Sequence, residues 1–225
     1  MAEQSASKDE AKTPFTIITG FLGAGKTTLI NYILTEQRDK RICVIENEFG
    51  EINIDEKLVS ANMASKEDLI QMDNGCACCS IRGDLVRTLG GLVEKRQQFD
   101  AVMLETTGLA DPAPVAQTFF VDDDVKEFCT LDGIITLVDA KHVVQHLDDE
   151  KPEGAENEAV EQVAFADRLI LNKCDLVPEE AELKKVEERL RAINKFAPIV
   201  RSTQAVVSAD QVLNIKAFDL EKTLE

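Results

Sequence analysis

The segment Gly20-Phe-Leu-Gly-Ala-Gly-Lys-Thr-Thr28 matches the full pattern G-x-x-x-x-G-K-T and directly follows an apolar run at Phe15–Thr19. The backbone N–H groups of such a glycine-rich loop can point inward at phosphate groups. A chance match somewhere in a chain of this length has a frequency on the order of a per cent. Its place between a predicted strand and a helix predicted over Lys26–Gln37 indicates a nucleotide phosphate site.

The residues of this loop have separate expected roles. Lys26 is expected to reach the β- and γ-phosphates and to take part in catalysis, and the Thr27 hydroxyl is expected to ligate Mg²⁺. Further contacts to the nucleotide are expected from Gly20, Gly23, Ala24, Gly25 and Thr28.

On either side of this loop, apolar runs of strand length alternate with helical patterns. Several runs are almost continuous in Ile, Val and Leu, as expected for parallel strands that are buried on both faces. Strands are predicted at Phe15–Thr19, Ile42–Glu46, Leu69–Met72, Ala101–Glu105, Gly133–Val138 and Arg168–Leu171, and helices at Lys26–Gln37, Ile81–Gln97, Pro114–Phe120 and Glu179–Phe196. This alternation predicts an α/β fold with a doubly wound, mostly parallel sheet.

Composition limits both the domain count and the partners. The 225 residues are 44% hydrophobic, which suits one globular domain, expected over residues 14–225. Residues 1–13 are mostly polar with nothing to bury and are expected to form a disordered leader. A net charge of −17 repels phosphate backbones and anionic lipid, so we expect neither nucleic acid nor membrane as a partner. Because the N-terminus is polar, we expect no secretory signal there, and no apolar run approaches the roughly 18 residues of a spanning helix. The cytosol is the default location, and the nucleus or an organelle is equally compatible with this composition.

A second motif, Asn172-Lys-Cys-Asp175, follows a late buried strand, where a base-reading loop belongs. The Asp175 carboxylate can accept hydrogen bonds from both N1–H and N2–H₂ of guanine, whereas adenine offers no such pair of donors. Asn172 and Lys173 complete this expected base contact. Alone, the motif is also compatible with an ordinary turn. After a phosphate loop it predicts GTP, and a P-loop kinase that uses ATP is the competing class.

The run Ala101-Val-Met-Leu-Glu105-Thr-Thr-Gly108 has the form of a Walker-B strand. Glu105 stands where an acidic residue would hold Mg²⁺, and Gly108 would let the backbone approach the γ-phosphate. A buried strand that ends at a turn is the alternative. No D-x-x-G-Q pattern is present to supply a glutamine that orients the attacking water, so we expect slow intrinsic hydrolysis.

Three thiols stand in four positions at Cys76, Cys78 and Cys79. Thiolates are soft ligands that select zinc or Cu(I) over magnesium, and a helix N-terminus would favour them. No second C-x-x-C closes a structural zinc site, so the cluster suits a metal that is passed on. A redox-sensing thiol pair and inert core cysteines are the alternatives. The other cysteines are isolated and are expected to be buried small hydrophobes: Cys43, Cys129 and Cys174.

Carboxylates and histidines elsewhere offer further ligands. Glu46 and Glu51 lie in a stretch, residues 46–55, that corresponds to the switch region of a P-loop GTPase, and they could add oxygen ligands to the same metal. A solvated acidic loop explains this stretch equally well. His142 and His146 have a spacing that can bind zinc, but without a third ligand nearby in sequence we expect a solvated helix face.

Five segments together closely resemble the CobW-like GTPases, also called zinc-regulated GTPase metalloprotein activators, which are related to the UreG and HypB proteins that load nickel enzymes. The segments are Gly20–Thr28, Glu46–Glu51, Gly75–Cys79, Glu105–Pro112 and Asn172–Asp175. The resemblance covers roughly residues 14 to 220. It implies a SIMIBI-type P-loop fold and GTP hydrolysis coupled to metal delivery, with zinc as the usual cargo. By this resemblance the metal would lie at Cys76, Cys78 and Cys79, with Glu46 and Glu51 as further ligands.

The resemblance also implies partners. A client apo-metalloprotein would receive the metal, and the relatives often work as homodimers. They usually continue into a C-terminal, mostly β domain, whereas this chain stops at Glu225, so we expect the GTPase domain only. Our leading hypothesis is a zinc metallochaperone that uses GTP and Mg²⁺. The alternatives are a zinc-binding sensor module with a vestigial GTPase and a cobalt chaperone for cobalamin synthesis.

Overall fold

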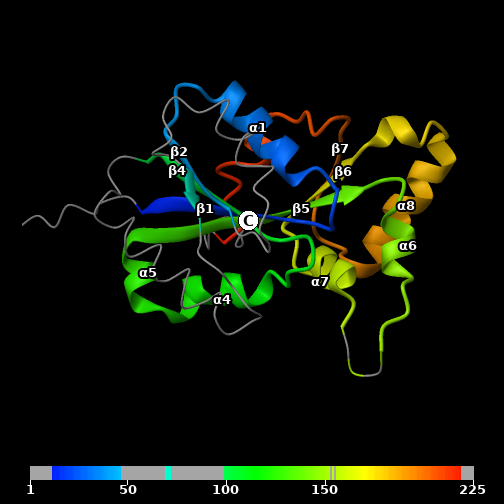
Figure 1. Ribbon diagram of the computed structural model, residues 1–225, viewed down its shortest axis with the longest axis horizontal. Coiled ribbons are helices and arrows are strands. Elements are labelled where there is room, and N and C mark those ends of the chain that lie inside the picture. The colour runs from blue at the N-terminus through cyan, green and yellow to red at the C-terminus, as the bar shows by residue number, and fades with distance from the viewer. Residues whose placement is uncertain (1–11, 47–68, 72–98, 153, 155, 219–225) are drawn as a thin grey trace, which may run out of the picture.

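A seven-stranded sheet forms the centre of the computed structural model, which describes residues 12–46, 69–71, 99–152, 154 and 156–218 (Figure 1). The strands are β1 (Thr13–Thr19), β2 (Ile42–Glu46), β3 (Leu69–Gln71), β4 (Ala101–Glu105), β5 (Cys129–Asp139), β6 (Arg168–Asn172) and β7 (Ile199–Arg201). Their spatial order is β3-β2-β4-β1-β5-β6-β7, and each pair of neighbouring strands is parallel. The predicted doubly wound α/β fold is confirmed.

Helices cover both faces of this sheet. They are α1 (Lys26–Glu36), α4 (Ala113–Val121), α5 (Asp123–Phe128), α6 (Val143–Leu147), α7 (Glu158–Ala164) and α8 (Glu180–Ile193). Figure 1 shows α1 on one side of the sheet and α4 and α5 on the other. Among the helices that the structure describes, none combines the length and the apolar character needed to cross a membrane.

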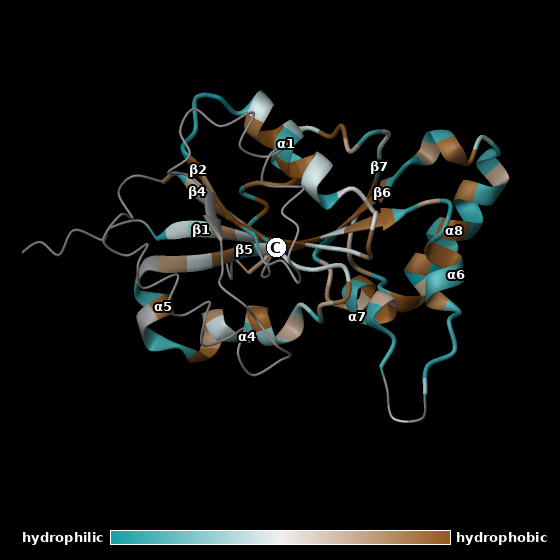
Figure 2. Ribbon diagram, viewed as in Figure 1, coloured by the Kyte–Doolittle hydropathy of each residue, from teal (hydrophilic) through white to brown (hydrophobic). Residues whose placement is uncertain are grey.

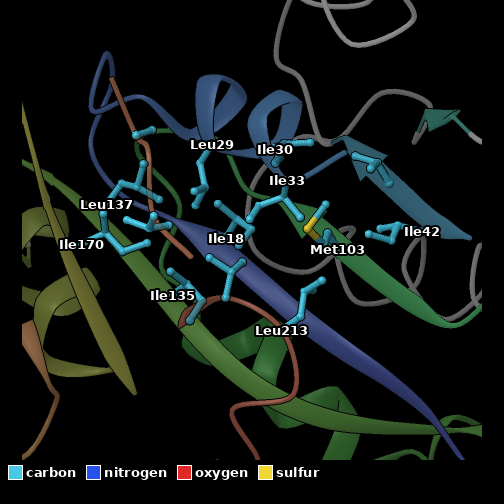
Figure 3. Close-up of a cluster of buried hydrophobic side chains, with 14 of the residues drawn as sticks. Ile18, Leu29, Ile30, Ile33, Ile42, Met103, Ile135, Leu137, Ile170 and Leu213 are labelled. Carbon is cyan, nitrogen blue, oxygen red and sulfur yellow. The ribbon is translucent and has the colours of Figure 1, made fainter. Parts of the chain in front are cut away.

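Successive strand residues belong to two different apolar layers. Ile17 of β1 packs in a cluster with Phe119 of α4, whereas its neighbour Ile18 packs with Leu29 and Ile33 of α1. Figure 3 shows this second layer, where side chains from β1, β4 and β5 meet the underside of α1. Both faces of the central strands are therefore buried, which is why they read as unbroken apolar runs in the sequence.

A third apolar layer lies at the β6 side of the sheet, where α6, α7 and α8 meet. Helix α8 buries Leu183, Val186 and Leu190 on one face and exposes most of its other positions. Figure 2 shows the contrast: β6 is mostly hydrophobic, while α8 carries hydrophobic and hydrophilic residues along its length. The apolar spacing of α8 is the 3.6-residue period of a helix with one buried face.

The structure shifts some predicted element boundaries. Strand β5 extends beyond the predicted Gly133–Val138 at both ends, and α8 ends at Ile193 because Asn194 leaves the helical conformation (φ −122°, ψ 105°). Strand β1 begins at Thr13, the last residue of the expected leader, and residues 1–11 lie outside the described part of the chain.

Several short elements were not predicted, and one predicted helix cannot be compared. Strand β7 and helices α5 and α7 are only three, six and seven residues long, too short to show a clear period. The predicted helix Ile81–Gln97 lies outside the described residues.

The strand order places the expected ligand site at the carboxyl end of the central strand β1. The chain runs from β1 to β2 on one side of it and later places β5 on the other side. In open parallel sheets a ligand binds outside the carboxyl ends of the strands at such a switch point. The register brings the ends of three strands to this edge, because Glu105 of β4 is level with Ile18 of β1 and with Glu46 of β2.

Candidate functional site

The loop between β1 and α1 has a backbone that requires glycine. Gly20, Gly23 and Gly25 have φ angles of +134°, +76° and +108°, which residues with a side chain rarely adopt. A Cβ atom on Gly20 would overlap the carbonyl oxygen of Leu137 on β5. The loop therefore lies close against the sheet edge, with the conformation that a phosphate-binding turn needs.

Lys26 points back into this loop from the first position of α1. Its Nζ donates hydrogen bonds to the carbonyl oxygens of Gly20 at 2.9 Å and Phe21 at 3.4 Å, and the residue is only 7% exposed. The first turn of α1 contains no acidic residue, so no side chain there offsets the positive end of the helix. The ammonium group and the helix end together make the loop an anion site.

Thr27 and Glu105 meet where α1 begins and β4 ends. The Thr27 Oγ1 donates to Oε1 of Glu105 at 3.0 Å and lies 3.3 Å from Oε2. A hydroxyl and a carboxylate oxygen are the hard donors that Mg²⁺ prefers, so the pair fits the magnesium ligands expected from the sequence. Glu46, 3% exposed, ends the neighbouring strand β2 at the same level as Glu105.

The loop that follows β4 runs directly beside the phosphate loop. The Thr106 N–H donates to the carbonyl oxygen of Ile18 at 3.0 Å, and its Oγ1 donates to Oγ1 of Thr19 at 2.9 Å. A Cβ atom on Gly108 would lie 2.6 Å from the backbone nitrogen of Leu22. Gly108 thus allows a close backbone approach to the phosphate loop at Leu22, and its predicted approach to the γ-phosphate stays a prediction.

Asn172 joins the expected base-reading motif to the phosphate loop. Its Nδ2 donates to the carbonyl oxygen of Ala24 at 2.9 Å, and its Oδ1 accepts from Ser202 Oγ at 3.0 Å and from the Ala205 N–H at 2.8 Å. The side chain is buried, at 2% exposure. Asn172 therefore positions two loops, a role that the sequence analysis did not assign to it.

The segment Ser202–Ala205 is a part of the site that the sequence analysis missed. It follows β7 at the same edge of the sheet as Asn172, and Gln204 and Ala205 have φ angles of 54° and 56°. The available signal was a short apolar pair, Ile199 and Val200, followed by small and polar residues. Three strand residues are too few for a periodic pattern to identify.

Lys173 and Asp175 lie on either side of Cys174 at the start of a single 3₁₀ turn. Lys173 has a left-handed backbone (φ 61°), and its Nζ donates to Oδ2 of Asp139 at 2.8 Å. Burial alone would raise the pKa of Asp139, but the hydrogen bonds from Lys173, His142 and the Lys141 N–H and the charge of Lys173 together hold that pKa below its usual value. Asp175 is exposed, so its carboxylate is accessible to a nucleotide base.

The two histidines do not act as a pair. His142 Nδ1 lies 3.0 Å from Oδ2 of Asp139, whereas the His146 ring stacks on Phe21 of the phosphate loop with centroids 3.9 Å apart. The expected solvated helix face is therefore wrong for His146. Its ring supports the phosphate loop from α6, and the spacing of the histidines gave no sign of this contact.

Most of the predicted metal ligands lie outside the described residues: Glu51, Cys76, Cys78 and Cys79. Within the described ranges, no group of three or more His, Cys, Asp or Glu residues is arranged to hold a metal ion. Cys43 and Cys129 are buried, as expected, and burial raises the pKa of the Cys129 thiol to about 12. These two cysteines belong to the core.

Comparison with known proteins gives relatives along most of the chain. The zinc chaperone YjiA of Escherichia coli is 39% identical over 213 residues, covering 93% of this chain and 63% of that protein. The zinc-regulated GTPase metalloprotein activator 1 of Schizosaccharomyces pombe is 37% identical over 93% of this chain and 51% of its own length. The chain thus spans about half to two thirds of the curated relatives it matches.

A solved structure supports the same relationship. The crystal structure of Zn(II)-bound YjiA GTPase from E. coli superposes with a TM-score of 0.68 at 32% identity, over 93% of this chain and 63% of that one. A family model described as the CobW/HypB/UreG nucleotide-binding domain matches residues 14–201. This range includes the phosphate loop, the Thr27–Glu105 pair and the Asn172 junction, and the chain belongs to the CobW/HypB/UreG nucleotide-binding domain family.

Proposed function

We propose that this chain is a GTP-binding and GTP-hydrolysing domain that holds zinc as cargo and delivers it to a client metalloprotein in the cytosol. The observation that carries the proposal is the Asn172 bond to Ala24, which fixes a guanine-type base loop against a phosphate loop. The two bonded residues are 148 positions apart in the sequence, so their contact argues against a chance turn. The family membership and the relatives' names support the reaction and the cargo.

The nucleotide roles follow from the contacts at the sheet edge. Lys26 would hold the β- and γ-phosphates, and the exposed Asp175 would read the guanine edge. Thr27 and Glu105 would hold Mg²⁺, which supplies positive charge against the terminal phosphates. The backbone of Gly108 would line the γ-phosphate side, because it already packs against Leu22 of the phosphate loop. Gly20, Gly23, Ala24, Gly25 and Thr28 would complete the phosphate cradle.

The zinc roles rest on the chemistry of the ligands. Cys76, Cys78 and Cys79 are soft ligands that suit zinc, and Glu46 and Glu51 would add oxygen ligands. Glu46 supports a link between zinc and nucleotide, because it is level with Glu105 on the adjacent strand. Adjacent strands are roughly 4.8 Å apart, so a change in the charge or the ligand of one carboxylate would alter the electrostatic environment of the other. If GTP changes the affinity for zinc, zinc must change the affinity for GTP by the same factor.

A zinc competition titration against a chromophoric chelator tests this function, under reducing conditions and with or without GTP–Mg²⁺. We expect one tightly bound zinc per chain, with an affinity that GTP–Mg²⁺ shifts. Tight zinc binding with the same affinity in the presence and absence of GTP–Mg²⁺ would favour a zinc sensor module with an uncoupled GTPase. Tighter binding of cobalt than of zinc would favour a cobalt chaperone. Absence of metal binding would favour a plain P-loop enzyme.

Two cysteine variants control this titration. Cys78→Ser should weaken zinc binding and leave metal-free GDP binding intact. Cys174→Ser is the matched control, because the Cys174 Sγ donates to the carbonyl oxygen of Leu171 at 3.1 Å and a serine hydroxyl can replace that bond. Sedimentation of the GTP- and GDP-bound protein in the same buffers tests whether the chain forms the homodimer that the family resemblance implies.

A further inference from the structure

Gln162 of α7 is a buried amide that holds the loop after β4, and no nucleotide motif contains it. The residue is 1% exposed, and its Nε2 donates to the carbonyl oxygens of Gly108 and Ala110, both at 3.1 Å. A primary amide nitrogen has two N–H groups, so these two bonds use both donors of the side chain. Gln162 also lines a small pocket together with Phe21 and Leu22, and so lies behind the phosphate loop.

Helix α7 gives Gln162 a fixed support. Asn157 caps its first turn by accepting from two backbone N–H groups at 3.0 and 3.2 Å. Asn194 donates to three carbonyl oxygens at its C-terminal end, at 2.8 to 3.2 Å. The Thr136 hydroxyl of β5 donates to the main-chain carbonyl oxygen of Gln162 at 2.7 Å. The helix is therefore held at its start, at its end and at Gln162 itself.

The hydrogen bonds to the carbonyl oxygens of Gly108 and Ala110 determine the conformation of the loop after β4. Leu109 lies between them and is 61% exposed, while Gly108 stays against the backbone of Leu22. Removing the Gln162 amide would leave the buried Gly108 carbonyl without that partner, which disfavours the observed loop conformation. The position of Gly108 beside the phosphate loop thus depends on a side chain 54 residues away.

We propose that Gln162 is a positioning residue for GTP hydrolysis, whose amide fixes residues 106–110 so that the Gly108 backbone is held at the γ-phosphate side of the site. This inference rests on the proposed GTPase function. The phosphate loop and the base loop make their described contacts without Gln162, so it acts on the step that involves the γ-phosphate and leaves GDP binding unchanged. An interaction of this kind lowers kcat when it is removed and leaves KM nearly constant.

The test compares GTP hydrolysis and GDP affinity in the wild-type chain, Gln162→Leu and Thr136→Val. Leucine is similar in size to glutamine and lacks both N–H donors of the side-chain amide. Valine at position 136 removes the bond to the Gln162 main chain and keeps the amide, so it controls for the packing of α7 on β5. We expect kcat of Gln162→Leu to fall about tenfold or more, with KM for GTP and Kd for GDP within about twofold of wild type. Thr136→Val should keep its kcat.

Two results would overturn the inference: an unchanged kcat in Gln162→Leu, or an equal loss of kcat in Thr136→Val. Stoichiometric GDP binding shows that each variant is folded. Gln162→Met, which keeps the unbranched shape without donors, replaces the leucine variant if that one fails to bind GDP. A wild-type chain that binds GDP but hydrolyses no GTP would contradict the proposed function instead.

Discussion

The hydroxyl of Thr27 donates a hydrogen bond to Oε1 of Glu105 at 3.0 Å, which joins the first turn of α1 to the end of β4. A hydrogen bond to an ionised carboxylate is stronger than one between neutral groups, so this contact fixes the distance between the two elements. The two residues are 78 positions apart, and they meet because β4 lies directly beside β1 in the sheet. The strand order therefore brings together the two residues that are expected to ligate Mg²⁺.

Glu105→Gln should lower the affinity for Mg²⁺ in the presence of GTP by about tenfold or more, because a neutral amide replaces an anionic oxygen ligand. GDP binding without Mg²⁺ should change little, since the phosphate loop is untouched. A titration of GTP hydrolysis with Mg²⁺ measures the effect. Glu36→Gln, at the exposed end of α1, is the matched control. An unshifted magnesium midpoint in Glu105→Gln would remove Glu105 from the ligand set.

Asn172→Ala should lower the free energy of unfolding by about 2–4 kcal/mol, because it removes three buried hydrogen bonds that join the phosphate loop to residues 202–205. It should weaken binding of GDP and ADP alike, since it disturbs the loop that holds phosphates. Urea denaturation and nucleotide titrations measure both effects.

Asp175→Asn provides the contrast to that variant. Asp175 is exposed, so its loss should change stability by less than about 0.5 kcal/mol. It should reduce the preference for GDP over ADP by about tenfold or more, because the paired acceptor for guanine is lost. Equal loss of GDP and ADP binding in Asp175→Asn would argue against a guanine-reading carboxylate.

The parts of the site that the sequence predicted are those whose chemistry is local. The phosphate loop works through the backbone of consecutive residues, so the glycine pattern from Gly20 to Gly25 was sufficient to place it. The central strands were predicted because burial on both faces leaves continuous apolar runs, as in β2 and β4.

The contacts that the sequence did not predict are long-range. Nothing near Asn172 in the sequence points to Ala24, and nothing near Gln162 points to Gly108, because these pairs form only when α7 and β6 pack beside the phosphate loop. Helices as short as α5 and α7 carry too few turns for a period to emerge. The ligand roles of Cys76, Cys78 and Cys79 stay predictions.

Gly108→Ala should lower GTP hydrolysis by about tenfold or more while GDP binding persists, because the new Cβ would lie 2.6 Å from the Leu22 nitrogen and the loop must move. Single-turnover hydrolysis and GDP titration separate the two effects. Gly154→Ala is the control for the added methyl group: unlike Gly108, Gly154 has a positive φ, of +85°, but no atom lies within 4 Å of its Cβ position. A Gly108→Ala protein with wild-type hydrolysis would show that the close approach to Leu22 is dispensable.

Asp167 makes the folding stability depend on pH. Burial raises the pKa of this carboxyl to about 6, although the Ile134 N–H donates to it at 2.8 Å and lowers the pKa, while nearby Asp132 adds to the rise. The folded chain therefore binds this proton more tightly than the unfolded chain, whose reference value is 3.8. The stability from this group is fully present below about pH 4 and is lost as the pH rises through about 6.

Asp167→Asn should therefore be more stable than the wild type above pH 6, by about 1–3 kcal/mol, because asparagine keeps the acceptor for Ile134 and carries no buried charge. The difference should shrink toward zero as the pH falls to 4, where the wild-type carboxyl is protonated. Urea denaturation of both proteins at half-unit steps from pH 4 to 7.5 measures it. Asp39→Asn, at an exposed position, controls for the loss of one negative charge. A stability difference that stays constant across this range would mean that Asp167 does not titrate there.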